Sequence, residues 1–85
     1  MGVATKHASF MYEIADEVVV RLDGVDAFDL TAGRAVERAR LPAWTIADVT
    51  ARAVQHARAV YAIRFRDGEA TCIAVIDESS IDGIA

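Results

Sequence analysis

The sequence predicts one α+β domain, residues 1–85, in which three helices pack against a small antiparallel β-sheet made by a C-terminal hairpin. Two observations indicate this fold class. Apolar residues recur at helical spacing in the first two thirds of the chain, and an Asp-Gly pair separates two strand-like runs in the last third. Hydrophobic residues make up 54% of the chain, which excludes a disordered protein and allows a modest core.

The first helix is expected at residues 9–22, after a flexible lead-in at residues 1–8. Gly24 is well placed to end this helix in a left-handed conformation. The β-branched run at residues 18–22 leaves a strand open as the alternative, with Asp23-Gly24 as a hairpin turn into residues 25–30. The helix prediction depends on seven apolar residues that follow the helical period: Phe10, Met11, Ile14, Ala15, Val18, Val19 and Leu22.

A second helix is expected at residues 32–40, where Thr31 can cap the first turn. Arg34 and Arg38 lie one turn apart on its outer side and repel each other unless an acidic group neutralises their charge. The apolar side consists of small residues that allow close packing: Ala32, Ala35, Val36 and Ala39.

The third helix, at residues 45–58, has the most local signals. Thr45 is a good N-cap, and the charge of Asp48 suits the positive end of a helix. Trp44 and Val49 can form a hydrophobic staple around the cap, and Pro42 separates this helix from the second one. The segment is amphipathic, with a polar side: Asp48, Arg52, Gln55 and Arg58.

The hairpin is expected at residues 60–66 and 69–76, with Asp67-Gly68 as its two-residue turn. In this register Ile63 lies opposite Cys72. Alternate residues then share one face, which we expect to cover the helices: Tyr61, Ile63, Phe65, Cys72 and Ala74. The open edge of the hairpin suits pairing with a second copy, and the acidic tail at residues 77–85 is expected to fray.

The net charge of −4 is divided into three blocks. Residues 13–29 contain six acids and one arginine (−5), residues 34–66 contain seven arginines and two acids (+5), and residues 67–82 contain five acids and no base (−5). Lys6 adds the remaining +1. The blocks either neutralise one another in the fold or present charged surfaces to a partner.

The residue pattern predicts a protein that is not an enzyme and has no metal or cofactor. One cysteine and two histidines cannot complete a tetrahedral zinc site, and the glycine spacing matches no phosphate-binding loop. His56 has no evident carboxylate or serine partner. The chain shows neither a signal peptide nor a run of about 18 apolar residues, so we expect it in the cytoplasm. Cys72 is either a small buried hydrophobe or a contact in a homodimer.

Two kinds of binding function follow from these features. Three helices and a hairpin permit a winged-helix DNA-binding regulator, with residues 45–58 as recognition helix and Arg66-Asp67-Gly68 as wing tip. The negative net charge and the position of Asp48 argue against DNA binding.

We therefore expect a protein-binding inhibitor. The acids of the first block can imitate a phosphate track and occupy a nucleic-acid-binding groove on another protein: Glu13, Asp16, Glu17, Asp23, Asp26 and Asp29. The alternative contact face would hold an acidic partner through arginines: Arg34, Arg38, Arg52, Arg58, Arg64 and Arg66.

The stretch Val25-Asp-Ala-Phe-Asp-Leu-Thr-Ala-Gly-Arg-Ala-Val-Glu-Arg38, 14 of 85 residues, is similar in texture to passages in some anti-CRISPR proteins against type I systems. Those passages consist of an extended segment, a Thr cap and an Ala-rich helix. The chain also resembles these small phage-encoded proteins in size, acidity and absence of a catalytic motif. The resemblance implies an inhibitor that binds a type I CRISPR effector complex (Cascade) and blocks target DNA recognition or nuclease recruitment. A different small interaction domain, such as an antitoxin or an assembly factor, stays open.

Overall fold

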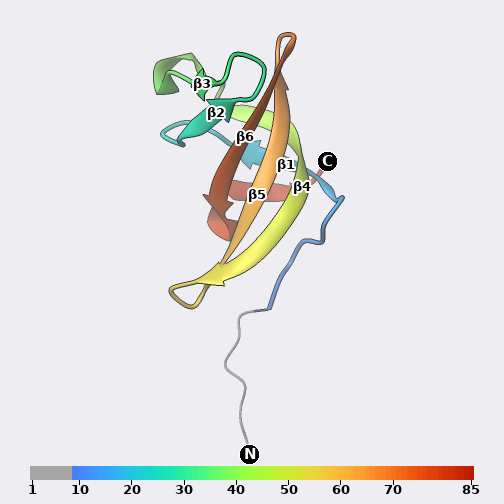
Figure 1. The fold of residues 1–85 in the computed structure, drawn as a ribbon. Helices are drawn as coiled ribbons and strands as arrows, with labels where there is room; N and C mark the ends of the chain where they lie inside the picture. The colour runs from blue at the N-terminus through green and yellow to red at the C-terminus, as the bar shows by residue number, and fades with distance from the viewer. Residues whose placement is uncertain (1–8) are drawn as a thin grey trace, which may run out of the picture.

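One curled antiparallel β-sheet forms the fold in the computed structural model, which describes residues 9–85 (Figure 1). Within these residues seven strands follow the order β3-β2-β6-β5-β4-β1-β7 and there is no α-helix, so the prediction of three helices on a small sheet is wrong. The elements are β1 (Glu17–Arg21), β2 (Ala27–Asp29), β3 (Arg34–Ala35), η1 (Arg38–Arg40), β4 (Trp44–Gln55), β5 (Arg58–Asp67), β6 (Ala70–Asp77), η2 (Glu78–Ser80) and β7 (Ile81–Ile84).

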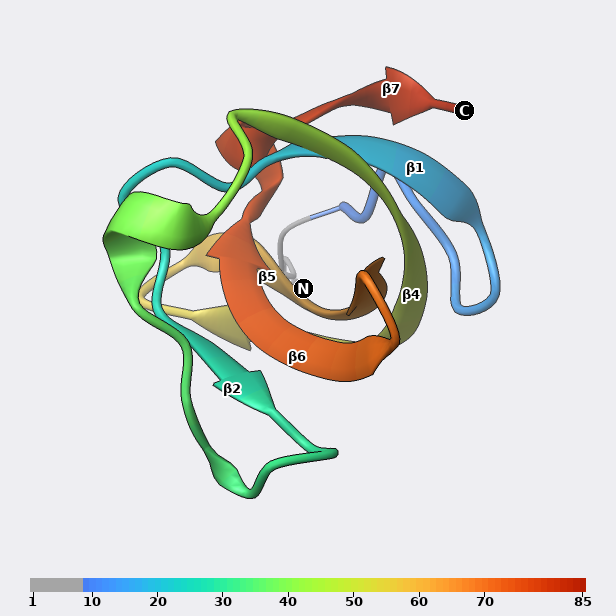
Figure 2. The same cartoon turned by 90° about the horizontal axis from the view of Figure 1, so that it is seen from above.

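The curl gives the sheet an inner face, which holds the core, and an outer face toward solvent. Figure 2 shows β6, β5, β4 and β1 wrapped around a common centre. Side chains alternate between the two faces along each strand, and in β5 the inward set is buried: Ala59, Tyr61, Ile63 and Phe65. Val18 and Val20 of β1 and Val49 of β4 join this core with at most 1% exposure.

The predicted C-terminal hairpin is present as β5 and β6, with its turn shifted by one residue. Asp67 pairs with Ala70, so Gly68 and Glu69 form the two-residue loop, and Ile63 lies opposite Ala74 instead of Cys72. Gly68 has a φ of 63°, a conformation that a glycine at the first loop position adopts without strain. The expected shared face is confirmed as buried, but β5 and β6 both lie between other strands and neither is an edge strand of the sheet.

The predicted third helix is instead a second hairpin, formed by β4 and β5. Gln55 pairs with Arg58, and the turn residues His56 and Ala57 have φ angles of 51° and 63°. Two positive φ angles define a type I′ turn, which normally uses Asn or Gly. Neither residue is present here, so the sequence showed no hairpin signal and the helical period prevailed. Thr45 is a strand residue and caps nothing.

The predicted first helix is replaced by a loop and strand β1. The strand alternative, proposed for residues 18–22, is confirmed at residues 18–21 by β1, but Asp23-Gly24 does not join two paired strands. β1 pairs with β4 and β7, whereas β2 pairs with β3 and β6. The predicted lead-in at residues 1–8 lies outside the described residues.

The predicted second helix is replaced by β3 and the short η1. The turn between β2 and β3 ends at Gly33, which has a φ of 71°. Thr31 caps no helix; its hydroxyl accepts a hydrogen bond from the Thr71 N–H at 3.0 Å. The tail expected to fray forms η2 and β7, and β7 pairs with β1.

Candidate functional site

The six acids predicted to bind a partner do not form one surface. Arg21 holds Asp23 at 2.8 Å, and this hydrogen bond lowers the pKa of the Asp23 carboxyl. Arg38 holds Asp26 at 2.5 Å. The Asp29 carboxylate accepts backbone N–H groups of its own turn at 2.8 and 2.9 Å. These three acids are therefore engaged within the chain.

The other three predicted acids lie close together in sequence at the start of β1. The Asp16 carboxylate accepts the N–H of Glu13 at 2.9 Å, so it stabilises the local turn. Glu13 and Glu17 are exposed. Glu17 alone of the six lies beside the charged groove described below.

The arginines of the alternative face are also spread over the molecule. Arg58 pairs with Asp77 at 3.2 Å, and Arg64 pairs with Asp48 at 3.5 Å. Arg34 is exposed on β3, and Arg66 is exposed near the end of β5. The pairs Arg38–Asp26 and Arg58–Asp77 join the basic block to both acidic blocks, so the blocks meet within one copy.

Cys72 lies on the inner face of β6 with 1% exposure. Burial raises the pKa of its thiol, which keeps the reactive thiolate scarce. A disulfide between two copies at Cys72 would require the core to open. The buried-hydrophobe interpretation fits this position, and the dimer contact predicted for Cys72 does not.

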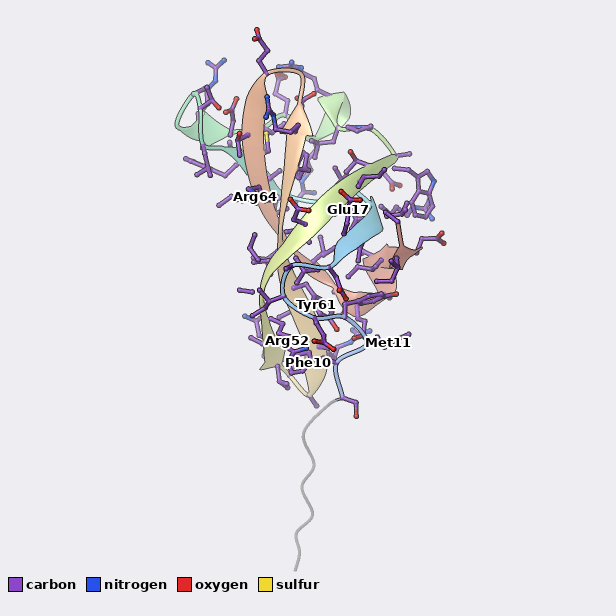
Figure 3. All side chains as sticks on the ribbon, turned by 90° about the vertical axis from the view of Figure 1, so that its right-hand side faces the viewer. Phe10, Met11, Glu17, Arg52, Tyr61 and Arg64 are labelled. Atoms are coloured by element: carbon purple, nitrogen blue, oxygen red, sulfur yellow. The ribbon has the colours of Figure 1, made fainter. Side chains whose placement is uncertain are left out.

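The register of the sheet brings together a row of side chains that the sequence did not predict. Phe28 pairs with Ile73, Ile73 with Arg64, Arg64 with Asp48, and Asp48 with Glu17. Directly paired residues of antiparallel strands project to the same side. These five residues therefore cross β2, β6, β5, β4 and β1 on the outer face, and we call them the outer-face row. Figure 3 labels Glu17 and Arg64 in this row.

The apolar end of the outer-face row lines a groove of about 510 Å³. Phe28 is 41% exposed, Ile73 37% and Val75 62%, and all three border this groove together with Thr50 and Ala62. Exposed apolar side chains gathered at one place mark contact sites for other molecules. The apolar run of β6, which continues on both faces of the strand, is the sequence signal that could have indicated this surface.

The charged end of the row lines a second groove of about 670 Å³. Glu17 lies directly across from Asp48, and like charges in such a pair repel. Arg64 offsets the charge of Asp48, while Glu17 has no cation within 4 Å among residues 9–85. A basic group supplied from outside would therefore be favourable beside Glu17.

A second polar cluster, centred on Tyr61, stabilises the fold. The buried Tyr61 hydroxyl accepts the N–H groups of Met11 at 3.1 Å and Tyr12 at 3.3 Å, and donates to the Glu78 carboxylate. Burial and the hydrogen bond to Glu78 raise the pKa of Tyr61. Arg52 donates to the Tyr12 carbonyl at 2.9 Å. Figure 3 labels Arg52, Tyr61, Phe10 and Met11 in this part of the molecule. These contacts fasten residues 10–12 against the inner face.

Among the described residues, no three His, Cys, Asp or Glu side chains gather where they could hold a metal ion. Residues 9–85 also contain no helix with the length and apolar character needed to cross a membrane. Comparison of the chain with models of known protein families, with curated proteins and with solved structures finds no match.

Proposed function

We propose that this chain is a non-enzymatic binding module that holds another protein through the outer-face row. The observation that carries the proposal is the exposure of Phe28, Ile73 and Val75 on the outer side of a sheet whose inner side already holds the core. Removing such apolar surface from water contributes roughly 25 cal/mol per Å². These exposed side chains contribute little to the stability of the fold, so most of the free energy from burying them becomes available when a partner covers them.

The charged end of the row indicates the chemistry of the partner. Glu17 and Asp48 face each other across two strands, with Arg64 beside only one of them. A partner that places an apolar side chain near Ile73 and a basic side chain near Glu17 complements both ends. This favours a protein with exposed lysines and arginines.

A type I CRISPR effector complex is the partner we propose to test first, because a protein that tracks DNA must present such basic groups. Binding there would block target DNA recognition or nuclease recruitment. The Ala-rich helix in the anti-CRISPR resemblance is absent, since residues 25–38 include β2 and β3. The proposal therefore depends on the outer-face row. The winged-helix alternative is withdrawn because residues 45–58 form most of β4, the turn after it and the first residue of β5, and not a recognition helix.

The test is co-elution of the chain with a purified type I effector complex on size exclusion, with and without target duplex. Ile73→Lys inserts a charge into the apolar end of the row and should abolish co-elution. Met11→Lys is the matched control, because Met11 is 70% exposed and its segment is held by Tyr61 at the inner face, away from the outer-face row. Both variants should unfold at the same urea concentration as the wild type.

The outcomes test the identity of the partner and the location of the contact surface separately. Co-elution that target duplex prevents, and that only Ile73→Lys removes, supports the proposal in full. Equal co-elution of both variants would place the contact elsewhere on the chain. No co-elution of the wild type would exclude this effector complex as the partner.

A further inference from the structure

Strand β4 is longer than its neighbour β1 and leaves part of one edge unpaired. β4 pairs with β1 through Trp44–Asp48 and with β5 through Asp48–Gln55. Residues 51–55 therefore have a strand partner on one side only within the described part of the chain. All five of these residues are exposed. We call this segment the β4 edge; Figure 1 shows its hairpin extending beyond the other strands.

The β4 edge is better suited to pairing than the two strands at the ends of the sheet, β3 and β7. β3 offers only two residues. The edge strand β7 has a register shift in its pairing with β1 and contains Asp82 and Gly83, features that discourage edge pairing. Residues 51–55 contain no proline, glycine or acid.

The single charge of the β4 edge is already held within its own copy. The Arg52 guanidinium donates to the Tyr12 carbonyl at 2.9 Å and lies 4.7 Å from the centre of the Phe10 ring. It therefore does not prevent strand pairing at this edge, as a free lysine side chain would. The backbone groups on this side of β4 are left to water or to another strand.

We propose that a second copy of this chain pairs with the β4 edge in antiparallel orientation, about a two-fold axis at Ala53. This register places Ala53 opposite Ala53 of the second copy, and Arg52 opposite Val54. The aliphatic stem of Arg52 can then cover Val54, and no like charges meet. A register centred on Arg52 would instead oppose two guanidinium groups. The contact is the same on both copies, so it closes as a dimer.

Self-complementarity is the reason for choosing a second copy as the occupant. An unrelated strand would gain the same backbone hydrogen bonds, but its side chains would not be matched to this segment. Reversed against itself about Ala53, the sequence Ala51-Arg-Ala-Val-Gln55 sets the two Ala53 residues together at the axis and keeps the two arginines apart. This inference does not depend on the proposed function, because it uses the far part of β4 and not the outer-face row.

Cysteine cross-linking tests the register directly. Under oxidising conditions Ala53→Cys should form a disulfide-linked dimer, because the two Cβ atoms at the axis are direct neighbours. Ala51→Cys is the matched control, since four residues of register separate the two copies of position 51, about 13 Å along the strands. We expect cross-linking of Ala53→Cys to be roughly ten times faster. The wild type, with Cys72 buried, reports any background.

Sedimentation equilibrium of the reduced protein supplies the second measurement. Ala53→Lys places two cations at the axis and should raise the dissociation constant of the dimer at least about tenfold. Ala35→Lys, an exposed alanine on β3, should leave this constant unchanged. A wild type that stays monomeric, a dimer indifferent to Ala53→Lys, or equal cross-linking at positions 51 and 53 would each overturn the inference.

Discussion

Tyr61 shows at the scale of one residue how the fold is closed at its N-terminal side. Its ring is fully buried, and its hydroxyl accepts two backbone N–H groups while donating to Glu78. The Phe10 and Tyr12 rings meet it edge-on, at 6.0 and 5.7 Å between centres. One side chain therefore fixes a loop that is about 50 residues away in sequence.

The substitution Tyr61→Phe should lower the free energy of unfolding by about 1–3 kcal/mol, because it leaves the Tyr12 N–H without its partner and removes one of the hydrogen bonds made by the Met11 N–H and by the Glu78 carboxylate. Urea unfolding followed by circular dichroism measures this change. Tyr12→Phe is the control, since the Tyr12 hydroxyl makes none of these bonds, and it should change the free energy by less than about 0.5 kcal/mol.

The raised pKa of Tyr61 adds a pH readout to the same pair of proteins. The folded state keeps the phenol protonated to a higher pH than the unfolded state, whose pKa is about 10. This contribution to stability is therefore complete below pH about 10 and is lost as pH rises through the folded pKa. The raised pKa of Cys72 likewise makes stability fall as pH rises, and this loss begins at a lower pH than that of Tyr61. Stability curves of wild type and Tyr61→Phe that fall in parallel would show that Tyr61 is not responsible.

The β4–β5 hairpin shows how tertiary structure can impose a turn at the scale of an element. His56 and Ala57 both occupy the left-handed region, with φ of 51° and 63°. Residues with a Cβ atom are strained in this region by about 1 kcal/mol each. Long pairing between the two strands holds the turn in place despite that strain.

The double substitution His56→Asn with Ala57→Gly should stabilise the protein by about 1 kcal/mol, because Asn-Gly is the preferred type I′ pair. Gly68→Ala should have the opposite effect, a loss of about 1 kcal/mol, since Gly68 is left-handed and a Cβ there meets open space, so that only strain changes. Thermal unfolding of the two variants measures both. A turn variant no more stable than the wild type would mean that the hairpin tolerates this geometry without cost.

At the scale of the whole molecule, the two faces of the sheet differ in burial: the inner face forms the core and the outer face is exposed. The inner face holds Ile63 with 0% exposure, whereas the outer face holds Ile73 with 37% exposure. These residues lie one position apart in the β5–β6 pairing, since Ile63 opposes Ala74 and Ile73 opposes Arg64. They therefore form a matched pair for separating stability from binding.

Ile63→Ala should lower the free energy of unfolding by about 2–5 kcal/mol, because it leaves a cavity in the core. Ile73→Ala should lower it by less than about 1 kcal/mol. Urea unfolding measures both. A large loss for Ile73→Ala would assign the outer-face row to stability and weaken the proposal that it binds a partner.

The sequence by itself determined those features of the fold that depend only on residues close together in the chain. The alternation in residues 61–74 identified the buried face of the C-terminal hairpin, and Asp67-Gly68 located its turn to within one residue. The β-branched run at residues 18–22 supported the strand alternative. These signals hold because side-chain alternation and left-handed glycines belong to the chain locally.

Only the tertiary structure decided the fold class and the candidate site. The Ala-rich stretch at residues 45–58 fits a helical period, yet Val49 is buried by pairing with Ile63, and no local signal marks the His56–Ala57 turn. The outer-face row likewise joins Glu17, Asp48 and Ile73 from distant parts of the chain. Strand pairing draws its energy from cross-strand contacts between residues far apart in sequence, and the register of those contacts cannot be read along the chain.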